Sequence, residues 1–248
     1  VGHFASAFLK MFVLKSRVAF LKRWKDNNNG FLATASQYKD FPLFSVPNAL
    51  LFSITMRAPL LLLGFFYDPK IVGFYALSER VLKTPLGLVA EPIRRVFIQR
   101  FDEKIKNKEA ISWQTIKLSV FLLVLLLPLF LIISMFGADI FALIFGKKWL
   151  ESGAISGIIF PWIYISFIVT PISSIYILLR KQHIWLRFQT LLALGTVALF
   201  LLLFYSNIEY FTFLKLFTLV NSVVYFVAFL HIILLSKSFD SSLRNGGY

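Results

Sequence analysis

The stretch that decides the fold class is LSVFLLVLLLPLFLIISMF, residues 118–136, which contains no charged side chain. An α-helix needs about 20 apolar residues to cross the hydrocarbon core of a bilayer, which is roughly 30 Å thick. Barrel strands are shorter and alternate in polarity, whereas this run is apolar throughout. Because backbone groups in lipid must be hydrogen-bonded within their own segment, the run predicts a membrane-spanning helix.

Similar apolar runs recur along the chain, in which 58% of residues are hydrophobic and only 15% are charged. Soluble domains have about a quarter charged residues, so this composition excludes an ordinary soluble fold. We therefore predict an all-α polytopic membrane protein whose residues 42–236 form a six-helix transmembrane bundle. The expected spans are about 44–66, 71–93, 116–136, 154–179, 184–205 and 211–235.

The segments around this bundle are shorter or more polar. Residues 1–14 resemble the end of a preceding transmembrane helix, 15–41 a basic cytoplasmic loop and 237–248 a cytoplasmic tail. Residues 139–151 are too short to span and predict an interfacial helix, with Trp149 at headgroup level. We expect Pro161 and Pro171 to interrupt the fourth span, because proline removes a helical hydrogen bond.

The distribution of basic residues predicts the orientation. Nineteen of the 26 Lys and Arg residues lie in 10–41, 94–117, 180–187 and the tail, whereas the intervening loops hold only Lys70, Lys147 and Lys148. Since cytoplasmic loops carry the excess of basic residues, we place the first set and the C-terminus in the cytoplasm of a bacterial or archaeal plasma membrane. The net charge of +14 then reflects proximity to anionic lipid, and we expect no nucleic-acid partner.

Sequence signatures of enzymes are missing. The chain has no cysteine, and its three histidines, His3, His183 and His231, show no metal-ligand spacing. It contains no GxSxG, HExxH or P-loop motif. We predict a transporter with no catalytic residues, no metal site and no cofactor.

Four charged residues fall inside the predicted spans. Arg57 lies in the first span, and Glu79, Arg80 and Lys83 lie in the second. Each costs roughly 2.5–3.5 kcal/mol at the centre of a membrane helix, so we expect them to face the bundle interior. Arg57 and Arg80 each lie about 14 Å from the connecting turn, at similar depth.

These charges predict a cationic site for an anionic ligand. Glu79 and Lys83 are spaced i,i+4 and can pair, which leaves Arg57 and Arg80 uncompensated. Arginine suits phosphate or carboxylate because its planar guanidinium donates two parallel hydrogen bonds. The alternative is that the four residues form structural ion pairs, or extend to the membrane surface.

Three neutral polar residues are secondary candidates for a polar cavity. Asn48 begins the first span, and Asn221 and Tyr225 are spaced i,i+4 in the last one. Hydrogen bonding between helices is the alternative explanation for the latter two.

Three stretches together resemble a known family. They are YKDFPLFSVPN (38–48), DPKIVGFYALSERVLKTPL (68–86) and FGADIFALIFGKKWLESG (136–153). In this order they resemble the Wzx-type polysaccharide flippases, within the superfamily that includes the MATE exporters. The resemblance implies a C-terminal lobe of a MATE-like fold that translocates undecaprenyl-pyrophosphate-linked oligosaccharide, as in O-antigen and lipopolysaccharide biosynthesis. It also implies alternating access, coupling to an H+ or Na+ gradient, and partners among membrane lipids and the polysaccharide polymerase and chain-length machinery.

Two other functions compete with this one. A MATE-like exporter of small organic cations would need acidic residues at the membrane midplane, where cations dominate in this sequence. A membrane glycosyltransferase or O-antigen ligase would need a long soluble loop with catalytic residues, and the loops here are short.

Overall fold

The computed structural model describes residues 40–244, with side chains from Val46 onward. From Pro47 on, the described residues belong to a single compact unit. The predicted helix end at 1–14 lies outside the described residues, as does nearly all of the predicted basic loop at 15–41.

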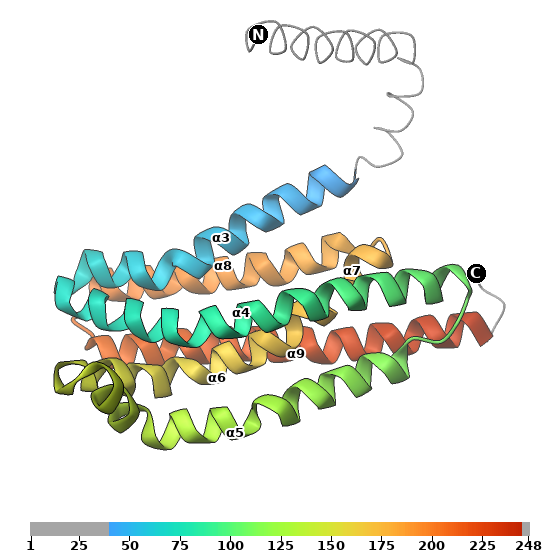
Figure 1. Cartoon of the computed structure of the whole chain (residues 1–248). Coiled ribbons are helices and arrows are strands. Elements are labelled where there is room, and N and C mark those ends of the chain that lie inside the picture. The colour runs from blue at the N-terminus through green and yellow to red at the C-terminus, as the bar shows by residue number, and fades with distance from the viewer. Residues whose placement is uncertain (1–39, 245–248) are drawn as a thin grey trace, which may run out of the picture. The chain divides into compact units, whose positions relative to one another are not determined.

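The described chain is all-helical, which confirms the predicted fold class (Figure 1). The elements in chain order are α3 (Asp40–Phe66), α4 (Pro69–Lys106), α5 (Ser112–Phe145), the 3-10 turn η1 (Lys147–Trp149), α6 (Leu150–Ile172), α7 (Ile175–Leu178), α8 (Gln182–Tyr205) and α9 (Tyr210–Arg244).

Five helical stretches among the described residues are long and apolar enough to cross a membrane, which indicates a multi-pass membrane protein. They are Val46–Phe66, Ser112–Phe145, Lys147–Leu178, Gln182–Tyr205 and Tyr210–Arg244. The sixth predicted span, 71–93, lies in α4, which is long enough to span but is not among the five. Its charged residues, three of them at Glu79, Arg80 and Lys83, lower its hydropathy below that of the other spans.

Residues 139–151 do not form the separate short helix that the sequence predicts. Helix α5 continues through Asp139 to Phe145, and only the short 3-10 turn precedes α6. Gly137 lies inside this helix, and a Cβ there would come within 2.8 Å of the Gly153 carbonyl oxygen, so its missing side chain lets α6 pack closely. The helix ends at Gly146, whose φ of 96° lies in the left-handed region that glycine adopts without strain.

Other helix boundaries also differ from the sequence prediction. Pro161 lies inside an unbroken α6, and the interruption comes just after Pro171, between α6 and α7. Helix α9 continues to Arg244, so most of the predicted tail at 237–248 is helical. Helix α4 likewise extends past the predicted span end at 93 to Lys106.

Helix α6 is the centre of the described unit. Its closest backbone approaches are to α5, α4 and α9, as Figure 1 shows. In its apolar stretch 61% of residues are buried, against 22–33% in the other four stretches, so α6 forms the core and the others present apolar faces to lipid. Helix α3, by contrast, makes few close backbone approaches to any other described helix.

Side-chain hydrogen bonds hold the connections at both ends of the unit. At the end that holds Tyr67, Gly146 and Ser206, here called the turn end, the Tyr67 hydroxyl donates to the carbonyl of Ile208 at 2.5 Å. The opposite end, with residues 107–111, 179–181 and the end of α9, is called the basic end. There the Asp240 carboxylate accepts the backbone N–H groups of Ile111 (2.8 Å) and Ser112 (3.0 Å) and so caps α5.

Candidate functional site

An ion pair on α4 forms the centre of the candidate site. The ammonium of Lys83 lies 2.5 Å from Glu79 Oε1, one helical turn away, as the i,i+4 spacing predicts. The two side chains are 29% and 22% exposed, so the pair is largely shielded by protein. The ion pair therefore has no net charge, and the two side chains contact each other without a ligand.

Two further helices fix the position of Lys83. Its Nζ lies 4.3 Å from the centre of the Trp162 ring on α6, and 3.9 Å from the sulfur of Met56 on α3. Trp162 is fully buried, and a desolvated cation–π contact contributes about 2 kcal/mol. The ammonium thus joins the charged site to the core helix.

A cavity of about 320 Å³ lies beside this pair. Its lining residues come from α3 and α4, and they are Phe52, Ser53, Met56, Arg57, Leu60 and Glu79. Arg57 is exposed and forms no ion pair with any described residue. Together with the Lys83–Glu79 pair, Arg57 gives the site two cations and one acid, a net charge of +1.

Arg80 does not line this cavity, so the structure does not bring Arg57 and Arg80 together there. Arg80 is exposed, forms no ion pair within the described range, and is not among the lining residues. Arg80 is rotated by about 100° around the helix from Glu79, the α4 residue that lines the cavity. Equal depth in the membrane places two side chains at one level but not on one face.

Comparison with known proteins places the chain in a family. A family model described as "Polysaccharide biosynthesis protein" matches residues 2–154, more than half of the chain. The chain belongs to this polysaccharide biosynthesis family. No curated protein and no solved structure matches it significantly.

The part that matches the polysaccharide biosynthesis family contains most of the candidate site. Arg57, Glu79 and Lys83 all lie within residues 2–154, whereas Trp162 lies just beyond them. Membership therefore supports a role in polysaccharide synthesis or export for the region that carries these charges.

The three secondary polar candidates, Asn48, Asn221 and Tyr225, do not line the cavity between α3 and α4. Asn221 is fully buried on α9, and its amide nitrogen donates to the Phe217 carbonyl at 2.8 Å. The Phe217 ring packs edge-on against Trp162, with 5.2 Å between ring centres. Tyr225, one turn further along α9, is 2% exposed. Asn48 is half-buried, with its side-chain oxygen unpartnered among the described residues.

Sequence reasoning missed two residues that the fold places in these surroundings. The Trp162 ring contacts the Lys83 ammonium, and Gln189 on α8 is fully buried beside the hydroxyl of Tyr225. A tryptophan and a glutamine in apolar runs give no sign of what they contact. A buried glutamine was the stronger signal, because an amide in a membrane span needs a partner.

The charged groups of the cavity suit the binding of an anion. Among residues 40–244, no three His, Cys, Asp or Glu side chains are grouped closely enough to hold a metal ion. The one carboxylate of the cavity, Glu79, already pairs with Lys83. The free guanidinium of Arg57 is the group available to an incoming ligand, and it favours phosphate or carboxylate.

Proposed function

We propose that this protein is a Wzx-type flippase that moves undecaprenyl-pyrophosphate-linked oligosaccharide across the bacterial inner membrane. It would act as a transporter, by alternating access, and not as an enzyme. The observation that carries the proposal is the cavity between α3 and α4. Arg57 lines it without an ion pair among the described residues, and Lys83 lies beside it, paired with Glu79. Membership of a polysaccharide biosynthesis family supports a glycan as the cargo.

The charge of the cargo explains why such a site is needed. Burying an unpaired charge in a medium as apolar as the membrane interior is very costly, so a pyrophosphate requires countercharge on its path. Arg57 supplies the first cation without breaking any ion pair in the described chain. The lipid tail can stay in the bilayer while the headgroup passes through the cavity, and rocking around a fixed site completes the transfer.

Glu79 offers a route for coupling to an ion gradient. It is the only acidic residue that lines the cavity, and it holds Lys83 at 2.5 Å. A proton or Na+ taken up at Glu79 would weaken this pair and turn the Lys83 ammonium toward the pyrophosphate. Coupling to H+ or Na+ therefore belongs to the proposal, with Glu79 as its site.

The test compares two arginines of equal depth. In a flippase-null strain complemented with the protein, Arg57→Ala should reduce surface polysaccharide at least about tenfold, the effect of losing one charge-assisted hydrogen-bond pair. Arg80→Ala, at the same depth but outside the cavity, is the matched control and should reduce it much less. Immunoblots of membranes should show equal amounts of both variants. Normal display with Arg57→Ala, or an equal defect with Arg80→Ala, would contradict the proposed site.

We also infer that the basic end faces the cytoplasm, as does the C-terminus. The chain has no cysteine, so a single introduced cysteine reports on one position. In intact cells, a membrane-impermeant maleimide should label Ser206→Cys at the turn end and leave Asn107→Cys at the basic end unlabelled until the cells are lysed. The reverse pattern would invert the orientation.

A further inference from the structure

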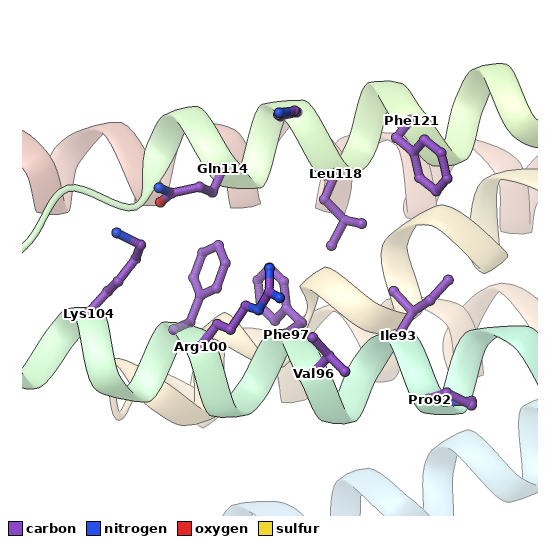
Figure 2. Close-up of a pocket in the computed structure, with 11 residues that line it drawn as sticks. Pro92, Ile93, Val96, Phe97, Arg100, Lys104, Gln114, Leu118 and Phe121 are labelled. Carbon is purple, nitrogen blue, oxygen red and sulfur yellow. The ribbon is translucent and has the colours of Figure 1, made fainter.

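A second and larger pocket lies between α4 and α5, near the basic end of the unit (Figure 2). Its volume is about 610 Å³. Ile93, Leu118 and Phe121 line one end, and Lys104 and Gln114 face each other from the two helices at the other end, as Figure 2 shows. Helix α4 ends and α5 begins at the basic end of the unit, which is where Lys104 and Gln114 lie (Figure 2). The pocket therefore has the polarity of a membrane leaflet, apolar inside and polar at the surface.

The polar end of this pocket is strongly cationic. Arg100, Lys104 and Lys117 line it, and no acidic side chain does. Lys104 is paired with Glu109 at 2.6 Å, and this hydrogen bond holds the pKa of the Glu109 carboxyl below its usual value, so the pair is intact at neutral pH. Arg100 and Lys117 are exposed and form no ion pair with any residue in 40–244. Two positive charges are therefore uncompensated.

An unpartnered acceptor lies beside these cations. The side-chain oxygen of Gln114 is buried and has no hydrogen-bond partner among the described residues. A buried acceptor without a partner costs about 1–3 kcal/mol in mutational data, and a ligand hydroxyl would remove this cost. The pocket thus offers two cations for a phosphate, one acceptor for a hydroxyl and an apolar wall for a hydrocarbon chain.

We propose that this pocket binds an anionic phospholipid, with its phosphate between Arg100 and Lys117 and its headgroup hydroxyl on Gln114. One acyl chain would lie along Leu118 and Phe121 toward the membrane interior. The site is separate from the cavity at Lys83, because 17 residues of one helix, about 26 Å, separate Lys83 from Arg100. The proposal does not depend on the proposed function.

The experiment measures lipid binding to the full 248-residue chain in mild detergent by native mass spectrometry. The probes are dioleoylphosphatidylglycerol and, as the zwitterionic comparison, dioleoylphosphatidylcholine. The double variant R100Q/K117Q should lose about thirtyfold in affinity for phosphatidylglycerol, the effect of two basic residues near an anionic membrane surface. Its affinity for phosphatidylcholine should change little.

The matched control is K237Q/R244Q, which removes one lysine and one arginine from α9. Both are exposed, both lie toward the basic end, and neither lines the pocket. This control should lose less than about threefold, because neither side chain lines the pocket and solvent-exposed charges are screened by salt. A second variant, Gln114→Leu, should weaken phosphatidylglycerol binding several-fold while leaving the cations intact. Equal loss in both double variants, or no loss in R100Q/K117Q, overturns the proposal.

Two competitors test which ligand the pocket accepts. Glycerophosphoglycerol, the headgroup without acyl chains, should not displace phosphatidylglycerol at equal concentration. If it does, the pocket binds free anions and the acyl chain has no site there. Displacement by undecaprenyl phosphate at lower concentration than phosphatidylglycerol would also refute the proposal, and would assign the pocket to the carrier lipid.

Discussion

The crossing of α5 and α6 depends on two glycines that face each other, and Gly153→Ala is the change that tests it. A methyl group on Gly153 would overlap the carbonyl oxygen of Gly137 and lie 2.5 Å from the Cα of Ala138. These are backbone atoms, which cannot rotate away as a flexible side chain can. Ser152, the residue before Gly153, also connects α6 to α4, because the Ser78 hydroxyl on α4 donates to the Ser152 carbonyl at 2.5 Å.

The size of the effect follows from these distances. Ordinary van der Waals contact begins at 3.4 Å, so the helices must move apart by at least about 0.9 Å at Ala138, and by more at the Gly137 carbonyl oxygen, to admit the methyl group. Overpacking a well-packed core costs about 1–3 kcal/mol, and we expect the upper part of this range because the clash is with backbone. Alanine offsets part of the loss, since it is favoured over glycine in a helix by about 0.5–1 kcal/mol.

Gly157, one turn further along α6, provides the matched control. A methyl group there would lie 3.6 Å from the Ile133 carbonyl oxygen and 3.7 Å from that of Ser134, which are ordinary contacts. Gly157→Ala should therefore be neutral or slightly stabilising. The free energy of unfolding of each variant can be measured by SDS titration of the purified chain, followed by circular dichroism. If Gly153→Ala unfolds at the same SDS fraction as Gly157→Ala, the close crossing does not exist as described.

Two further predictions concern the Lys83–Glu79 ion pair and the cap that Asp240 provides for α5. Replacing only one member of the Lys83–Glu79 pair should destabilise the chain more than replacing both, with a coupling energy of about 1 kcal/mol or more between K83M and E79Q in a double-mutant cycle; additive effects would show that the pair is not coupled. Asp240→Ala leaves the N–H groups of Ile111 and Ser112 without their acceptor at a cost of about 1–3 kcal/mol. Hydrogen exchange at these two amides should accelerate, and unchanged exchange would show that Asp240 does not cap α5.

The fold class could be predicted because the membrane imposes one requirement on every span. Runs such as 118–136 have few alternatives to a helix, and the five apolar helical stretches overlap five of the six predicted spans. The boundaries were less predictable, because they depend on contacts between helices. The predicted third span ends at 136, yet Gly137 lies inside the same helix as a packing position against Gly153, and nothing in the local sequence indicates that contact.

The candidate site was predictable in composition and less so in geometry. The cost of a charge in lipid singled out Arg57, Glu79 and Lys83, and helical spacing gave the Lys83–Glu79 pair. The similar depth of Arg57 and Arg80 did not indicate that Arg80 lies outside the lining of the cavity between α3 and α4. Trp162 lies two helices further along the chain, and its contact with Lys83 exists only in the folded protein.

The two helices that line the cavity differ in how extensively they pack against the rest of the protein, and this difference matters for transport. Glu79 and Lys83 belong to α4, which is tied to the core helix α6 through Trp162 and the Ser78–Ser152 hydrogen bond. Arg57 belongs to α3, which makes few close backbone approaches to the other described helices and contains Pro59 two residues after Arg57. Sparse packing and a missing helical hydrogen bond allow a helix segment to move at low cost. A displacement of α3 would therefore change the distance from Arg57 to the Lys83–Glu79 pair without disturbing the core. In the proposed flippase, the anion site would form when α3 lies against α4 and open when it moves away.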